Sequence, residues 1–194
     1  ATQRRGINQL QAVQEGRADY TPVFLSEIPE LFQPGGPLPL DVAFLHVTPP
    51  DDERNCSLGV SVDCAMAAAT NADVVVAQVN PRMPRTHGEG MVHSSRFAAL
   101  VEVDEALPEV DYASAVGPVE ERIGALCSAL IEDGSTLQMG IGAIPDAILR
   151  GLKNHKDLGV HTEMLSDGLL PLLDSGVITG SHKRKYPGRV VTGF

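Results

Sequence analysis

Short runs of β-prone apolar residues alternate along this chain with stretches whose composition favours helix. In the first half the clearest apolar runs are residues 23–25, 42–47 and 74–79. The last two are almost continuously apolar, which is typical of strands covered on both faces of a sheet. Between them, Asp63 is expected to cap a helix through residues 64–69, which are strong helix formers. The pattern predicts a β-α-β crossover in a mainly parallel sheet.

The same alternation continues in the second half. Pro118 suits a first helical turn, and apolar residues recur at helical spacing from there to Glu132. The elements expected after it are a strand at 136–139, a helix from Pro145 to Leu152, a strand at 158–162, and a helix at 169–173 that ends at Gly176. The fold class is therefore α/β, with open, mainly parallel sheets and flanking helices. A boundary near 107–117 divides the chain into units at 1–112 and 113–194.

The composition and charge of the chain restrict the kinds of molecule that it is expected to bind. The 194 residues are 43% hydrophobic with a formal net charge of −10, which describes a globular domain and argues against a nucleic-acid partner. Residues 1–112 hold 16 acidic and 7 basic side chains, whereas 113–194 hold 9 and 8, so the second half repels an anionic ligand less. No run approaches the roughly 18 apolar residues of a membrane span, and no secretory apolar region is present. A cytoplasmic protein is expected.

The three cysteines are scattered and form no C-x-x-C pair. They are Cys56, Cys64 and Cys127, and their number is odd. Neither a disulfide framework nor a zinc site is predicted, and no metal is expected. We interpret all three as reduced thiols.

A glycine turn lies between the predicted strand at 136–139 and the helix that follows. It reads Gly140, Ile141, Gly142, Ala143 and Ile144. Glycine lets a ligand approach the main chain, and the unpaired N–H groups of a helix start favour an anion or an oxyanion. The dinucleotide fingerprint requires a third glycine where Pro145 stands, and no G-K-[ST] of a P-loop follows. A tight strand-to-helix turn without a ligand is the alternative interpretation.

Two further groups of polar residues follow predicted strands, at the edge where parallel sheets carry ligands. Glu163 follows the strand at 158–162, as a candidate catalytic carboxylate or a solvated helix cap. The loop at 80–90 carries Asn80, Arg82 and Arg85, candidate contacts for an acid substrate's carboxylate or simple surface charge. His161 is expected either to orient Glu163 or to pack.

Residues 131–147 (IEDGSTLQMGIGAIPDA) and 158–168 (LGVHTEMLSDG) together strongly resemble the acetyl-CoA hydrolase/transferase family, and within it the 4-hydroxybutyrate CoA-transferases. In the first half, residues 22–29 (PVFLSEIP), 47–51 (VTPPD) and 79–80 with the following loop are similar too. The resemblance covers essentially the whole chain. It implies the class I CoA-transferase-like fold, also called NagB/RpiA/CoA-transferase-like, with parts of two related domains. Residues 1–112 then correspond to the latter part of the N-terminal domain and 113–194 to the first part of the C-terminal domain.

The resemblance also implies roles. Glu163 matches the catalytic glutamate, and the CoA-binding segment falls on Gly140, Ile141, Gly142, Ala143 and Ile144. Acyl-CoA and a short-chain carboxylic acid are the implied substrates, with no permanently bound cofactor and a homodimer or dimer-based oligomer. The basic run His182 to Lys185 is a candidate for the CoA phosphates, although a solvated connection is the favoured interpretation. The full protein is expected to be more than twice this length, so this chain alone should have little or no transferase activity.

Three alternatives remain from the sequence. The first is an acyl-CoA hydrolase, in which water attacks the glutamyl-CoA intermediate. A non-catalytic binding module of the same superfold would keep the phosphate turn without the chemistry. A nicotinamide-dependent dehydrogenase is the third.

Overall fold

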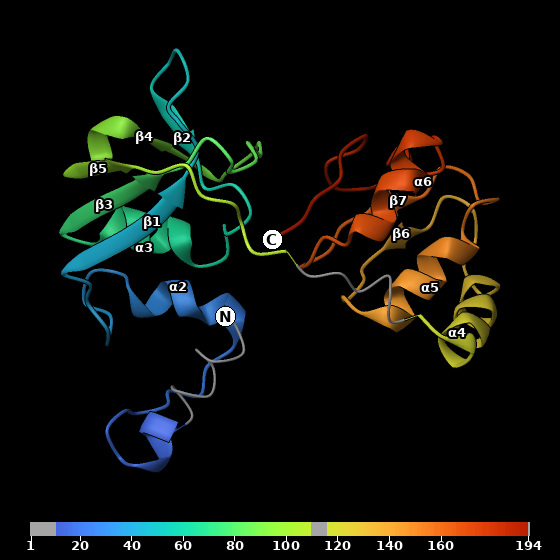
Figure 1. Ribbon diagram of the computed structural model, residues 1–194, viewed down its shortest axis with the longest axis horizontal. Coiled ribbons are helices and arrows are strands. Elements are labelled where there is room, and N and C mark those ends of the chain that lie inside the picture. Colours follow the sequence, from blue (N-terminus) through green and yellow to red (C-terminus); the bar gives the residue numbers. More distant parts are fainter. Residues whose placement is uncertain (1–10, 110–115, 194) are drawn as a thin grey trace.

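The computed structural model describes residues 11–109 and 116–193. The first of these ranges carries a three-stranded parallel sheet in the order β1-β3-β5, as Figure 1 shows. The strands are β1 (Val42–Val47), β3 (Val74–Val79) and β5 (Ala99–Glu102). β1 and β3 have the bounds predicted from their apolar runs, and their parallel pairing from Val42↔Val74 to Val47↔Val79 confirms the crossover.

Helix α3 (Ala65–Asn71) provides the crossover between β1 and β3. Its N-cap is Cys64, with no side-chain cap bond; Asp63 instead accepts a hydrogen bond at Oδ1 from the Cys64 N–H. The prediction of an Asp63 cap was therefore wrong, because the helix begins one residue later than the composition indicated. Ala69, Val75 and Ala77 are buried in the core between α3 and the sheet.

The opposite face of this sheet is open in the described part of the chain. Burial alternates along β1 and β3, and Phe44 is 80% exposed. The expectation that both strands are covered on both faces is thus not met in this structure, although the apolar run that led to it forms the strands.

The short elements described in the first half lie before β1 or in the connections between the three strands. They are a 3-10 helix at Leu25–Glu27, α2 (Ile28–Leu31), the antiparallel pair β2 (Asn55–Ser57) and β4 (Met91–His93), and a 3-10 helix at Ser94–Arg96. The strand predicted at 23–25 was wrong. The run is only three residues long, no neighbouring strand pairs with it, and Phe24 is exposed.

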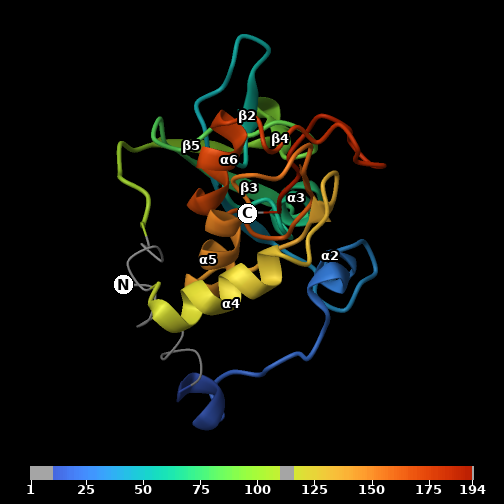
Figure 2. The ribbon, with the colours of Figure 1, turned by 90° about the vertical axis from the view of Figure 1, so that its right-hand side faces the viewer.

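Residues 116–193, the described part of the second half, contain one short parallel pair and three α-helices. The elements are α4 (Pro118–Ser128), β6 (Thr136–Leu137), α5 (Ala143–Gly151), β7 (Gly159–Val160), a 3-10 helix at Asp167–Leu169, and α6 (Leu170–Asp174). α4 packs across α5 in both Figure 1 and Figure 2. A Cβ on Gly124 would lie 2.6 Å from the Ala147 carbonyl carbon, so glycine permits this close crossing.

The predicted order of elements in this half is confirmed, with different bounds: both strands and α4 are shorter than predicted. β6 and β7 are two residues each, extended by single bridges at Leu158↔Ile178 and His161↔Val191. α4 ends at Ser128 rather than Glu132, and α5 begins at Ala143, two residues before Pro145. Leu152, Leu158 and Leu169 are fully buried in the core of this half.

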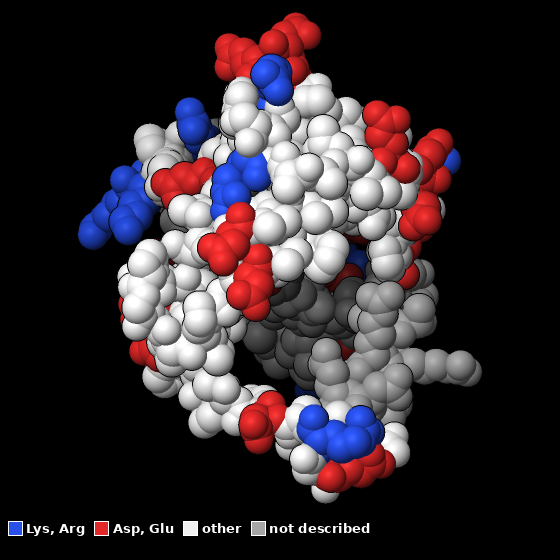
Figure 3. Space-filling model, turned by 90° about the vertical axis from the view of Figure 1, so that its left-hand side faces the viewer, with Lys and Arg blue, Asp and Glu red and all other residues white. Residues whose placement is uncertain are grey.

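The surface fits the charge argument. In the view of Figure 3, acidic and basic side chains lie around a broad uncharged area, and the described part of this face shows no wide basic surface. Among the described residues, no helix is both long and apolar enough to cross a membrane.

Candidate active site at the edge of β6 and β7

The glycine turn and Glu163 follow neighbouring parallel strands at equal distance. Leu137 pairs with Val160 in the ladder of β6 and β7. Gly140 stands three residues after Leu137, and Glu163 stands three residues after Val160, so the two are opposite each other by register. The structure therefore brings together the two motifs that the sequence placed at one sheet edge.

A single buried hydroxyl joins these two segments just before the site. Thr162 Oγ1 donates to the Met139 carbonyl at 2.9 Å and accepts from the Met139 N–H at 3.1 Å. One residue earlier, the His161 N–H donates to the Leu137 carbonyl at 2.9 Å. These bonds keep the two segments in contact beyond the ladder, as far as Met139 and Thr162, one residue before Gly140 and Glu163.

The glycine turn has a backbone that only glycine adopts readily. Gly142 has φ 117° and ψ −178° and is the N-cap of α5. The N–H groups of Ala143 and Ile144 occupy the first helical turn, where no intrahelical acceptor exists, and Pro145 has no N–H. These N–H groups at the start of the helix are suited to bind a negatively charged oxygen.

The main chain around Glu163 is also held by the segment at residues 191–193. The Gly193 N–H donates to the Glu163 carbonyl at 2.9 Å, and Thr192 Oγ1 donates to the same oxygen at 3.2 Å. The Thr162 N–H in turn donates to the Val191 carbonyl at 2.9 Å. The main chain at Glu163 is thus fixed from both sides, while the residue itself is exposed.

His161 lies beside an aromatic ring. Its ring centroid is 6.3 Å from that of Tyr186, with the planes tilted by 45°. This arrangement favours the packing interpretation. A role for His161 in orienting Glu163 stays a prediction.

The basic run at 182–185 divides into one buried and three exposed residues. Lys183 is only 5% exposed, and its Nζ donates to the Val160 carbonyl at 2.7 Å and to the Arg189 carbonyl at 2.6 Å. The solvated connection expected for this run was wrong for Lys183. Its ammonium joins the end of β7 to the chain segment that returns to Glu163.

We expect the Lys183 ammonium to make stability depend on pH. Burial lowers the pKa of Lys183 from its ordinary value. The unfolded chain therefore binds more protons between the lowered pKa and about 10.4, and the free energy of unfolding rises with pH across that window. In Lys183→Met this rise is absent. Urea unfolding at about pH 7.5 and about pH 10 measures it.

The exposed neighbour Lys185 supplies the matched control. Lys185→Met removes one positive charge from the same run without removing the buried group. A rise with pH in Lys183→Met equal to that of the unmodified protein would contradict the assignment.

The polar loop after β3 is held by its own side chains. Asn80 is fully buried; its Nδ2 donates to the Glu105 carbonyl at 2.8 Å, and its Oδ1 accepts from the Arg82 N–H at 3.1 Å. Arg82 is exposed and pairs through Nε with Asp104 Oδ1 at 2.5 Å. This hydrogen bond raises the pKa of Arg82.

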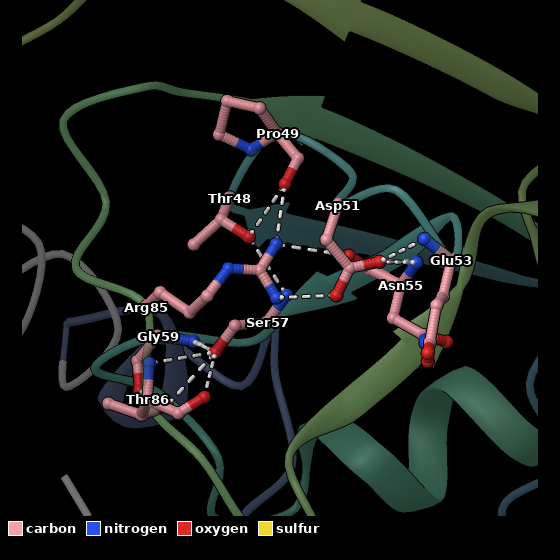
Figure 4. Close-up of polar contacts among 9 residues, drawn as sticks. All are labelled: Thr48, Pro49, Asp51, Glu53, Asn55, Ser57, Gly59, Arg85 and Thr86. Atoms are coloured by element: carbon pink, nitrogen blue, oxygen red, sulfur yellow. Dashed lines mark hydrogen bonds and ion pairs between the residues drawn. The ribbon is translucent and has the colours of Figure 1, made fainter.

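Arg85 forms hydrogen bonds and an ion pair with the connection between β1 and β2, as Figure 4 shows. Its Nη2 donates to the carbonyls of Pro49 at 2.9 Å and Asn55 at 3.1 Å, and its Nη1 lies 3.2 Å from Asp51 Oδ2. Beside it, Ser57 Oγ accepts from the N–H of Thr86 and donates to its carbonyl (Figure 4). This network could not be predicted from local sequence patterns, because the residues that it joins are about thirty positions apart in the chain.

Arg85→Met is expected to lower the free energy of unfolding by about 1–2 kcal/mol. The substitution removes charge-assisted hydrogen bonds to the Pro49 and Asn55 carbonyls, each of which keeps one neutral donor, from Thr48 Oγ1 and the Asp51 N–H respectively. Arg122→Met on the exposed side of α4 is the control, with a change within about 0.5 kcal/mol. Equal urea midpoints for the two variants would show that Arg85 does not hold the loop.

A large cleft lies next to these groups. Its volume is about 1400 Å³, and its walls include Arg82 from the polar loop, Ile141 from the glycine turn, and Asp146 and Ser166. Asn80, Arg85 and Glu163 do not belong to its lining. The sequence did not indicate Asp146 or Ser166, which carry no motif of their own. Among the described residues, no group of three or more His, Cys, Asp or Glu could hold a metal ion.

Comparison with known proteins assigns the chain to a family. Residues 6–115 match the model of the acetyl-CoA hydrolase/transferase N-terminal domain. The chain belongs to the acetyl-CoA hydrolase/transferase family. This confirms the family predicted from the motifs at 131–147 and 158–168.

The acetyl-CoA hydrolase/transferase relatives are similar over nearly the whole chain. A protein of Fasciola hepatica named succinyl-CoA:acetate/propanoyl-CoA:succinate CoA transferase is 50% identical over 190 residues, which is 97% of this chain and 39% of that protein. The 4-hydroxybutyrate coenzyme A transferase of Clostridium kluyveri is 49% identical over 183 residues, 94% of this chain and 42% of that protein. The chain thus spans only 39–42% of the length of these relatives.

The fold of the acetyl-CoA hydrolase/transferase family is also present in solved structures. The crystal structure of 4-hydroxybutyrate CoA-transferase from Porphyromonas gingivalis superposes with a TM-score of 0.84 at 46% identity, covering 96% of this chain and 47% of that one. This likeness confirms the α/β fold class predicted from the sequence.

Proposed function

We propose that the whole protein is a CoA-transferase that moves CoA from an acyl-CoA to a short-chain carboxylic acid such as 4-hydroxybutyrate. The observation that carries this proposal is the position of Glu163, opposite Gly140 by register and next to an anion-suited helix start. Relatives at 49–50% identity that are named CoA transferases support it.

Glu163 supplies the nucleophile in this proposal. Its carboxylate oxygen attacks the thioester carbonyl carbon, the carbon–sulfur bond breaks, and CoA leaves as thiolate, giving an acyl-glutamyl anhydride. The thiolate then attacks the glutamyl carbonyl and releases the first acid as its carboxylate. A second carboxylate takes the CoA through the reverse steps. Because one thioester replaces another, no ATP or metal is consumed.

The glycine turn stabilises the charge that develops in these steps. Each tetrahedral intermediate carries an oxyanion, and the N–H groups of the turn from Gly140 to Ile144 are the donors proposed for it. One such donor is typically worth roughly 2.7–4 kcal/mol of the barrier. The same segment is proposed to hold CoA.

Among the three candidate substrate contacts, the geometry favours Arg82. It lines the same cleft as Ile141 of the glycine turn, its pair with Asp104 is exposed to solvent, and a guanidinium is suited to a carboxylate. The side chains of Asn80 and Arg85 are engaged in holding the loop. We therefore propose Arg82 as the contact for the acid, with Asn80 and Arg85 acting through the loop.

Mass spectrometry of the full-length protein after acyl-CoA treatment tests this function. We expect CoA mass on the peptide that contains Glu163, and its loss when the acceptor acid is added. CoA release that does not depend on the acid would show a hydrolase instead. Binding of CoA without an adduct would show a binding module, and binding of NAD would point to the dehydrogenase. Dimer-based assembly and a cytoplasmic location stay predictions.

A further inference from the structure

Two buried hydrogen-bonded contacts lie on either side of the candidate active site. One is Thr162 on Met139, immediately before Glu163 and Gly140. The other joins Ser166, three residues after Glu163, to Asp146 in the first turn of α5. The segment that carries Glu163 and the segment that carries the glycine turn are therefore linked both before and after their reactive groups.

The Thr162 contact depends on a hydroxyl. Its oxygen is donor to the Met139 carbonyl and acceptor from the Met139 N–H at the same time, which valine of equal shape cannot reproduce. Thr162 is 6% exposed, so water cannot readily replace either bond. These bonds stand where the β6–β7 ladder has ended.

The Ser166 contact fixes the chain after Glu163. Ser166 Oγ donates to Asp146 Oδ1 at 2.5 Å and accepts from the Gly168 N–H at 3.3 Å, which begins the 3-10 helix at Asp167–Leu169. Both partners are at least nine-tenths buried, and a hydrogen bond to a carboxylate is stronger than a neutral one. Asp146 lies four residues after Gly142, so the bond ties the start of α5 to the path of the chain beyond Glu163.

We propose that Thr162 and the Ser166–Asp146 pair are positioning residues that set the distance between Glu163 and the N–H donors of the glycine turn. This rests on the proposed CoA-transfer function. A displacement of about 1 Å between reacting groups can cost roughly 100-fold in rate, so two contacts on either side of the site control the reaction through the distance that they set.

The test uses the full-length protein, four single variants and one double variant. Thr162→Val and Ser166→Ala are each expected to slow formation of the glutamyl-CoA adduct by about 10- to 100-fold, with the dissociation constant for CoA within about threefold of the unmodified protein. Thr162→Ser keeps the hydroxyl and is expected to restore the rate. Asp146→Ala is expected to slow the adduct in the same range as Ser166→Ala, and the double substitution to add little to Ser166→Ala, because both single variants remove the Ser166–Asp146 bond.

The opposite edge of the same unit offers matched controls. Thr179 Oγ1 and Ser181 Oγ donate to Asp157 Oδ1 at 3.0 and 3.4 Å in an exposed cluster. Thr179→Val and Ser181→Ala therefore remove the same kinds of group away from the site, and both are expected to keep the adduct rate of the unmodified protein.

Hydrogen exchange of the ligand-free protein separates the two proposals. Peptides that cover 138–144 and 162–168 are expected to exchange faster in Thr162→Val and Ser166→Ala and to be unchanged in the controls. Exchange and adduct rates equal to those of the unmodified protein would overturn the positioning roles. Lower thermal stability with an unchanged adduct rate would do so as well. Absence of an adduct in the unmodified protein would instead overturn the proposed function.

Discussion

Glu163→Gln in the full-length protein is expected to abolish CoA transfer. The amide is nearly the same size as the carboxylate and leaves the bonds to the Glu163 carbonyl in place, but it has no anionic oxygen to attack a thioester. Loss of a covalent nucleophile costs kcat on the order of 10⁴-fold or more. The measurement is the steady-state rate with an acyl-CoA and an acceptor acid, together with the mass of the peptide that contains residue 163.

Glu132→Gln is the control for this change. Glu132 is an exposed carboxylate before β6, on the far side of the strand from the glycine turn. It is expected to keep both the rate and the adduct. A CoA adduct of normal yield in Glu163→Gln would remove Glu163 from the mechanism.

Gly142→Ala is expected to lower the free energy of unfolding by about 1–3 kcal/mol, because φ 117° with ψ −178° is a region that residues with a Cβ scarcely adopt. No heavy atom lies within 4 Å of the position that the new Cβ would take, so the cost is backbone strain rather than a clash. If the turn relaxes to relieve the strain, its N–H donors move and transfer slows as well. Urea unfolding and the transfer rate, measured together, report both effects.

Gly140→Ala is the companion variant two residues earlier. Gly140 lies outside the positive-φ region, and its Cβ would meet only Pro145 Cγ at 4.0 Å, an ordinary contact. Its free energy of unfolding is expected to stay within about 0.5 kcal/mol of the unmodified protein. Equal losses of stability in the two variants would refute the strain at Gly142.

The parts of the fold that the sequence predicted best are those with long apolar runs. β1 and β3 were predicted to the residue because six consecutive strand-forming positions leave little choice of element. β6 and β7 are shorter than predicted because only two residues of each form the ladder, and side-chain and single-bridge contacts continue it. The run at 23–25 failed because strand formation needs a partner, which no local pattern reveals.

For the site, the sequence predicted candidate residues whose type and position suggest a chemical role. It did not predict residues whose role depends on contacts made in the folded chain. Glycine spacing and a lone acid after a strand marked Gly142 and Glu163 as candidates. Nothing in the local sequence separates Lys183 from its basic neighbours, although only Lys183 is buried. Thr162, Ser166 and Asp146 acquire their partners twenty or more residues away, so they became visible only in the folded chain.

The parallel pairing of β6 and β7 also determines where the chain can change length. The connection between α5 and β7 returns to the edge opposite Glu163, where the Gly134 N–H donates to the Lys156 carbonyl and the Lys156 N–H donates to Asp133. Residues inserted there extend a surface loop and leave the register intact. A single residue inserted between Val160 and Glu163 would move the carboxylate to the other face of the sheet, since side chains alternate along an extended chain. Natural insertions and deletions should therefore gather at the first position and avoid the second.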